Sequence, residues 1–236
     1  GVATSGIEGI IIGILITMEV LAFLFVFILG ASVGSFINVL IDRLPVHQSI
    51  FFNRSHCAKC KKKLTPLELI PVVSYLVLRG KCKKCKSKIP TRIFFVEAIN
   101  GLLYSAVFLL YIQGSVDFIN LVYLLLLLPL FIGIFFTDFD FGIIPDELIL
   151  TASGIVFVYL ALYSPGSIIN HFLAGVGFLL VFLLIFLATS GRGMGFGDVK
   201  LSFVLGLFLG FPMSVVSAYL AFLTGAMVAI ILVLWG

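Results

Sequence analysis

The four cysteines of this chain have a spacing that predicts metal binding. They form two CxxC pairs, Cys57 with Cys60 and Cys82 with Cys85, and 21 residues separate the pairs. Two such pairs are typical of a site in which four thiolates bind one zinc ion. Because the protein supplies all four ligands, we expect the zinc to be structural rather than catalytic. Two disulfides or free thiols are the alternative, and a reducing cytoplasm would disfavour the disulfides.

Five of the eleven acids gather in two short polar segments between long apolar runs. They are Asp138, Asp140, Asp146, Glu147 and Asp198. An acidic residue at the end of a membrane span is a candidate functional residue. Asp146 and Glu147 follow Pro145, so the start of a helix is sufficient to explain them. Asp198 follows the glycine-rich stretch Gly191–Gly197, which lets the backbone approach another chain or a substrate closely.

Two carboxylates from these two segments, meeting at one membrane face, would suit the pair of acids of an aspartic protease. Two carboxyl groups a few ångströms apart share one proton, because the repulsion between two like charges keeps both groups from ionising. The ionised partner takes a proton from water, and the protonated partner donates to the oxyanion or to the leaving nitrogen. His47, His56 and His171 are scattered, so no Ser–His or Cys–His arrangement competes.

The composition indicates an integral membrane protein. Of the 236 residues, 61% are hydrophobic and 11% are charged, whereas soluble domains are about 45–50% apolar and about 25% charged. A crossing needs about 20 apolar residues. The long apolar runs are 10–41, 98–116, 118–137, 148–191 and 201–236.

The run 148–191 is long enough to cross twice, and the last run is expected to form two short spans. A turn is expected at Ser164–Gly166 in the fourth run, and a break is expected at Gly210–Pro212 in the last. We therefore predict an all-α, polytopic transmembrane helix bundle with about seven spans, six or eight being the alternatives, and a small zinc-binding loop domain.

The distribution of basic residues predicts the orientation. Thirteen of the fifteen Lys and Arg residues lie between Arg43 and Arg92, so the positive-inside rule places the insert 42–92 in the cytoplasm. Two spans separate the insert from Asp138, and two more separate Asp138 from Asp198, so all three segments return to the same face. We expect three parts: 1–41 with the first span, the zinc-binding insert 42–92, and a protease domain 93–236.

At these residues the sequence resembles the bacterial type IV prepilin peptidase family, whose members share a GxGD loop with other membrane aspartic proteases. The resemblance covers nearly the whole chain after residue 28. The matching segments are Gly34–Pro45 (GSFINVLIDRLP), the two CxxC pairs, Ile70-Pro71, Arg79–Cys82, Glu97, Asp138 with the following Pro145-Asp146, and Gly195–Asp198. Ala58 and Leu69 depart from the family's usual Pro and Asn.

The resemblance implies that Asp138 and Asp198 are the catalytic acids. It implies an enzyme of the bacterial inner membrane that cleaves the leaders of prepilins and pseudopilins after a Gly on the cytoplasmic side. It also implies N-methylation of the new N-terminus with S-adenosylmethionine. The expected partners are these substrates and the lipid bilayer, with no nucleic acid.

Residues that would bind S-adenosylmethionine are not evident. The stretch Gly191–Gly197 reads GxGxGxG rather than GxGxxG, and no βαβ pattern surrounds it. Glu19 and Glu97 are candidates for polar roles near such a site, or they are structural acids that face the bundle. The main alternative function is a membrane transporter with a zinc-stabilised loop, in which intramembrane acids carry protons or cations.

Overall fold

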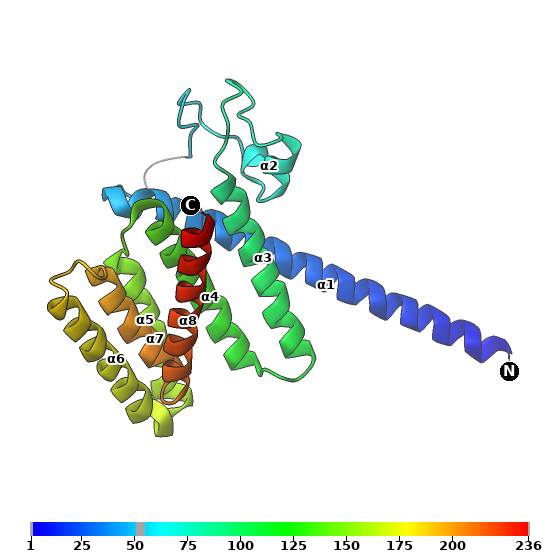
Figure 1. The fold of residues 1–236 in the computed structure, drawn as a ribbon. Coiled ribbons are helices and arrows are strands. Elements are labelled where there is room, and N and C mark those ends of the chain that lie inside the picture. The colour runs from blue at the N-terminus through cyan, green and yellow to red at the C-terminus, as the bar shows by residue number, and fades with distance from the viewer. Residues whose placement is uncertain (1, 51–54, 236) are drawn as a thin grey trace. The chain divides into compact units, whose positions relative to one another are not determined.

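A computed structural model describes residues 2–50 and 55–235, with side chains from Met18 onward. Within these residues nearly every regular element is helical, and β-structure is limited to two isolated bridges. The chain forms two compact units, Gly1–Gly142 and Ile143–Gly236, which are described separately below. Figure 1 shows the helices of both units. The predicted all-α class is confirmed.

The first unit is built on three long helices, α1 (Val2–Arg43), α3 (Thr91–Ile112) and α4 (Phe118–Phe141). The backbones of α1 and α3 approach closely where α1 has glycine. A Cβ atom added to Gly34 would lie 2.8 Å from the Cα atom of Glu97, and one added to Gly30 would lie 2.7 Å from the carbonyl oxygen of Asn100. Small residues at such crossings are typical of membrane helix pairs.

Local contacts and backbone conformation determine where α4 begins and ends. The Asp117 carboxylate accepts the Asn120 backbone N–H at 2.7 Å, which caps the N-terminus. Gly142 ends the helix in the left-handed region at φ 64°, a conformation that favours glycine. The helix therefore continues past the apolar run, and Asp138 and Asp140, which the sequence places in the polar segment after that run, lie in the last turn of the helix.

The insert between α1 and α3 contains three short elements. These are the 3₁₀ helices η1 (Leu44–Val46) and η2 (Pro66–Leu69) and the helix α2 (Val73–Val77). Figure 1 shows α2 beyond the first turn of α3. So small a segment cannot bury a core of its own, and segments of this kind usually need a metal or covalent links.

The second unit contains α5 (Asp146–Tyr163), η3 (Pro165–Ser167), α6 (Ile168–Ala188), α7 (Phe196–Leu209) and α8 (Met213–Trp235). The turn expected at Ser164–Gly166 and the break expected at Gly210–Pro212 are both confirmed. Helix α7 packs along α6: a Cβ atom on Gly206 would lie 2.7 Å from the Cα atom of Gly175.

Six helices in the described part of the chain are long and apolar enough to cross a membrane. They are α1, α3, α4, α5, α6 and α8. The seventh apolar helix, α7, has 14 residues and reaches about 21 Å, less than the roughly 30 Å of hydrocarbon. The predicted polytopic bundle is confirmed, and α7 accounts for the difference between six and seven spans.

Candidate metal centre and catalytic acids

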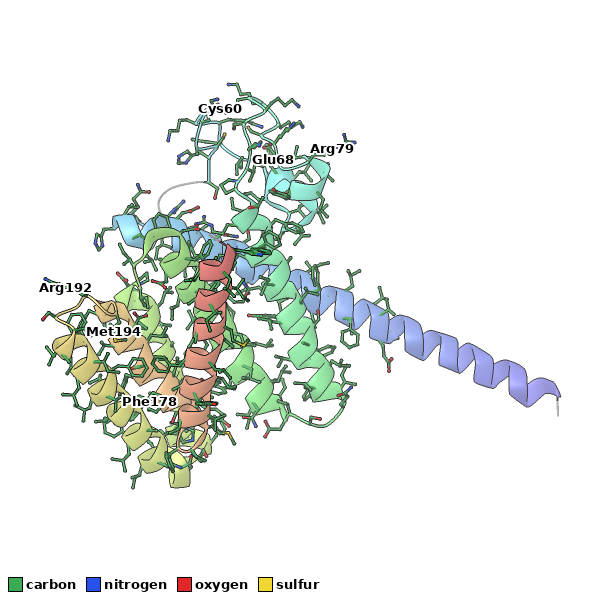
Figure 2. All side chains as sticks on the ribbon, viewed as in Figure 1. Cys60, Glu68, Arg79, Phe178, Arg192 and Met194 are labelled. Carbon is green, nitrogen blue, oxygen red and sulfur yellow. The ribbon has the colours of Figure 1, made fainter. Side chains whose placement is uncertain are left out.

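The four cysteine sulfurs of the insert lie within 4.8 Å of one another. The Sγ atoms of Cys57 and Cys85 are 3.8 Å apart, and those of Cys60 and Cys82 are 4.0 Å apart. A zinc ion about 2.3 Å from each of four tetrahedral sulfurs would space them about 3.8 Å apart. The donor set and its spacing therefore fit a zinc ion. Figure 2 labels Cys60 in this part of the insert.

The two CxxC segments share one backbone conformation. The Cys57 N–H donates to the Lys62 carbonyl at 2.9 Å, and the Cys82 N–H donates to the Ser87 carbonyl at 2.9 Å. An isolated β-bridge closes each segment. The bridged pairs are His56 with Lys63 and Lys81 with Lys88. The centre is therefore an internal repeat in which two equivalent turns supply two sulfurs each.

Each of these turns contains a lysine in the left-handed region. Lys61 has φ 55° and Lys86 has φ 58°, one position after the second cysteine of each pair. This conformation costs about 1–2 kcal/mol for a residue other than glycine. Metal binding at the neighbouring thiolates would offset this cost.

The thiols differ in their tendency to ionise. Hydrogen bonds from the backbone N–H groups of Cys60 and Lys59 lower the pKa of Cys57 to about 6. The Ser87 hydroxyl lowers the pKa of Cys85. The Lys62 N–H also favours the Cys60 thiolate, but burial and the neighbouring thiols raise the pKa of Cys60 to about 11. Four thiolates this close would repel one another, so all four can ionise together only beside a cation such as a divalent metal.

Glu68 makes polar contacts that stabilise the insert between the two turns. The Lys62 ammonium donates to Glu68 at 2.8 Å, and the Thr65 N–H donates to the same carboxylate at 3.0 Å. The Lys62 ammonium and the Thr65 donors lower the pKa of Glu68 to about 2. Figure 2 labels Glu68 in the insert.

Glu97 joins the insert to the helices. This residue is 5% exposed and its carboxylate accepts the Val72 N–H at 2.7 Å. Val72 has φ 62°, which is a strained conformation for a β-branched residue. Glu97 therefore has a structural partner. Glu19, the other acid considered for a polar role, is exposed on α1.

Asp138, the first candidate catalytic acid, is exposed in the last turn of α4. Its backbone carbonyl accepts the Gly142 N–H at 2.7 Å, so the cap fixes the turn that carries it. Its neighbour Thr137 is fully buried and donates its hydroxyl to the Gly133 carbonyl. The Asp138 carboxylate thus projects from a well-anchored turn.

Asp140 has a different environment from Asp138. Its carboxylate accepts from the Arg92 guanidinium at 2.7 Å, and the same guanidinium also pairs with Asp42. The Arg92 side chain is 11% exposed. Arg92 thus joins the ends of α1, α3 and α4, and Asp140 has a structural role in this cluster.

Asp198, the second candidate, lies in the first turn of α7 and is half-buried. Its carboxylate accepts the Gly195 N–H at 3.1 Å. Beside it, a Cβ atom on Gly197 would lie 3.1 Å from the Cβ atom of Ile144. The glycine at position 197 is therefore what lets α7 begin against the segment that leads into α5.

Asp146 and Glu147 lie in the first turn of α5, as the sequence indicated. Asp146 also pairs with Lys200 of α7, and Lys200 lies 5.4 Å from the centre of the Phe196 ring. This contact gives Asp146 a structural partner. It also means that the residue two positions after each candidate acid, Asp140 or Lys200, is tied to a neighbouring helix.

Several contacts near the candidate residues were not predicted from the sequence. Arg92 was counted only as part of the basic insert, and the partner of Glu97 was unknown. The repeated turns had a detectable signal, because the lysine-rich CxxC segments align with each other. The ion pairs of Arg92 join residues about 50 positions apart, and no local pattern predicts such contacts.

Two family models match different parts of the chain. Residues 28–111 match the family model described as Bacterial Peptidase A24 N-terminal domain. Residues 124–230 match the Type IV leader peptidase family. No solved structure was found to match the chain.

Curated relatives align over most of the chain. A Bacillus subtilis (strain 168) protein named Prepilin leader peptidase/N-methyltransferase is 33% identical over 215 residues, which cover 89% of this chain and 83% of the relative. Proteins of the same name from Aeromonas salmonicida (strain A449) and Neisseria gonorrhoeae are 32% and 31% identical. Those alignments cover 91% and 87% of this chain, and 82% and 80% of the relatives.

Proposed function

Because the chain belongs to the type IV leader peptidase family, we propose that it is an aspartic endopeptidase of the bacterial inner membrane. Its substrates are type IV prepilins and pseudopilins, and it cleaves their leaders after a Gly residue at the cytoplasmic face. It then N-methylates the new N-terminal residue. Asp138 and Asp198 form the catalytic pair.

The contact between Gly197 and Ile144 carries this proposal. Asp138 lies one helical turn before Gly142, and two further residues lead to Ile144. Since helix rises about 1.5 Å per residue and extended chain at most about 3.6 Å, the Cα atoms of Asp138 and Ile144 lie within about 13 Å. Ile144 contacts Gly197, the neighbour of Asp198. The covalent chain therefore supports a pair formed by these two acids.

The helix ends suggest separate roles for the two acids. Asp198 lies at the N-terminus of α7 and accepts the Gly195 N–H, so we assign it as the ionised base. Asp138 lies at the C-terminal end of α4, where the helix carries negative partial charge, so we assign it as the proton-bearing acid.

In the proposed reaction, Asp198 takes a proton from water as the water oxygen bonds to the peptide carbonyl carbon. Asp138 donates its proton to the carbonyl oxygen, so that a neutral diol forms. The proton on Asp198 then passes to the amide nitrogen, and the C–N bond breaks. The proton of one diol hydroxyl returns to Asp138, which leaves a free acid and an amine.

The orientation also supports the site of cleavage. Two candidate spans, α3 and α4, lead from the basic insert to Asp138, and two more, α5 and α6, lead from there to Asp198. An even number of crossings would return each acid to the side of the insert. By the positive-inside rule that side is cytoplasmic. A pilin helix held in the bilayer would present its leader junction there. The insert is basic, as the leaders are, so charge attraction does not explain leader recognition.

We further propose that Cys57, Cys60, Cys82 and Cys85 bind a structural zinc ion. Four protein ligands leave no open position for substrate, so the metal would hold the two CxxC turns together. We also propose that residues 1–41 contain the first span, that residues 42–92 form the zinc-binding insert, and that residues 93–236 form the protease domain.

S-adenosylmethionine, when bound, would supply an electrophilic methyl group for the new N-terminal amine. The stretch Gly191–Gly197 follows helix α6 rather than a strand, so it does not fit a dinucleotide-binding loop. A cavity of about 750 Å³ between the insert and the ends of α1 and α3 is large enough for such a ligand. We assign no residue to the cofactor.

Co-expression with a type IV prepilin of known sequence tests this function. We expect the intact mass of the prepilin to fall by the mass of the leader and to rise by one methyl group. Full-length prepilin recovered beside correctly inserted enzyme would contradict the peptidase, and leader loss without the methyl group would contradict the methyltransferase alone.

A further inference from the structure

We propose that Arg92 is a positioning residue for this reaction: it orients the last turn of α4, and it neutralises Asp140 next to the catalytic pair. This inference rests on the proposed function of Asp138. Arg92 does not itself contact the reacting atoms in this account. It acts through Asp140.

The contacts of Arg92 place its charge at a junction of three helices. It lies in the first turn of α3, and its guanidinium donates to Asp140 of α4 at 2.7 Å and to Asp42 of α1. The guanidinium side chain is 11% exposed, whereas Asp140 and Asp42 are 31% and 53% exposed. A largely desolvated cation bound by two carboxylates restrains its partners more than a surface pair does.

Because Asp138 and Asp140 lie on the same helix, a restraint on the direction of Asp140 also fixes the direction of Asp138. Asp138 and Asp140 are two residues apart, so their side chains leave the helix about 200° apart and on nearly opposite sides. Because Arg92 holds Asp140 toward α1 and α3, Asp138 must point away from them. The Gly142 N–H, bound to the Asp138 carbonyl at 2.7 Å, fixes the same turn from its end. Arg92 therefore defines where the Asp138 carboxyl points.

The charge of Arg92 has a second effect. An unpaired Asp140 carboxylate would be a second negative charge beside two acids that share one proton and so carry one negative charge between them. The remaining charged groups at this end are otherwise engaged: Arg43 of α1 donates to the carbonyls of Ser49 and Ile50, and Glu97 of α3 accepts the Val72 N–H. In the described part of this unit Arg92 is the cation paired with Asp140.

The orientation of Asp138 and the charge of Asp140 should have different effects on the kinetics of leader cleavage. Removing the cation with Arg92→Gln disorients Asp138 and leaves Asp140 charged. We expect kcat to fall at least about tenfold with little change in KM, because misplacement of a reacting group costs rate. We also expect both limbs of the pH–rate profile to move to higher pH by up to about one unit, since a nearby negative charge disfavours ionisation.

The double variant Arg92→Gln/Asp140→Asn provides the decisive comparison. It still lacks the restraint, so kcat stays low. The net charge of the cluster equals that of the wild type, because Asp42 then carries its one remaining charge, so the pH limbs return to their wild-type positions. Asp140→Asn alone should lower kcat and move the limbs in the opposite direction, to lower pH, because Arg92 keeps its positive charge and one negative charge is lost. Asp117→Asn at the other end of α4 is the matched control, because asparagine caps a helix as well as aspartate does.

The measurement uses the full chain in lipid bilayers with a purified prepilin. Wild-type kcat in Arg92→Gln, or a pH shift that persists in the double variant, would overturn the inference. If Arg92→Gln does not fold, Asp140→Asn decides: a kcat equal to that of Asp117→Asn refutes the restraint. The proposed function fails separately, if Asp138→Asn still cleaves the leader.

Discussion

Gly197 of α7 lies directly against Ile144, the residue that precedes Pro145 and α5. A Cβ atom added to Gly197 would lie 3.1 Å from both the Cβ and the Cγ1 atoms of Ile144. The backbone beside Asp198 thus approaches the segment that continues from α4. This approach positions the start of α7, and the first prediction concerns it.

Replacing Gly197 with Val should displace the first turn of α7. The added methyl groups have no room, so we expect leader cleavage to slow by about 10- to 100-fold and stability to fall by about 1–3 kcal/mol. Gly154→Val on α5 is the matched control, because a Cβ atom there meets nothing within 4 Å. Cleavage rates of the two variants in bilayers make the comparison. Equal rates would show that the close contact is not needed.

The metal site should hold one zinc ion per chain. We expect Cys57→Ser and Cys82→Ser to lose most of the metal, because three thiolates bind it more weakly than four. Metal content measured by mass spectrometry checks this outcome, with Ala58→Ser as the control in the same turn. A Cys57→Ser protein with full zinc content would contradict the assignment of that ligand.

Glycine substitutions at Lys86 and Lys84 should have opposite effects on zinc retention, because of the two only Lys86 lies in the left-handed region. Lys86→Gly should strengthen zinc retention, because glycine adopts φ 58° without the cost of about 1–2 kcal/mol that lysine has there. Lys84→Gly should weaken retention, since the φ of Lys84 is not positive and glycine only adds freedom to the unfolded chain. Zinc release to a chelator measures both. The same sign for both variants would contradict the turn conformation.

Glu68 should stabilise the insert over a defined pH range. Its pKa falls from an ordinary value near 4.5 to about 2 in the folded insert, so its contribution is complete above about pH 4.5 and is lost only as the pH falls toward 2. Glu68→Gln should therefore increase hydrogen exchange in the segment 65–69 by the same factor at pH 5 and pH 8. A factor that changes between these two pH values would refute the ionised pairing with Lys62.

Local patterns predicted the architecture because composition and chain breakers act locally. The turn at Ser164–Gly166 and the break at Gly210–Pro212 follow from Gly and Pro, which disrupt helices wherever they occur. The end of α4 was misplaced for a related reason. The apolar run stops at Thr137, but the helix continues to Phe141 because the cap at Gly142 and the Arg92 pair stabilise a charged final turn.

The candidate site was only partly predictable. The four cysteines could be identified because metal ligands need particular atoms at particular spacings. The partners of Asp140 and Glu97 lie 48 and 25 residues away in sequence, and such contacts depend on packing rather than on local pattern. The sequence therefore indicated which acids were available, and the contacts of the helices distinguish Asp140 from Asp138.

The central claim is that Asp138 and Asp198 together cleave the leader. Its most direct test is the intact mass of a prepilin after incubation with the wild type, Asp138→Asn, Asp198→Asn or Asp140→Asn in bilayers. We expect cleavage to be abolished in the first two variants, because each removes one carboxyl of the pair, and to be reduced but measurable in Asp140→Asn. Normal leader removal by either Asp138→Asn or Asp198→Asn, in a folded and zinc-loaded protein, would contradict the account.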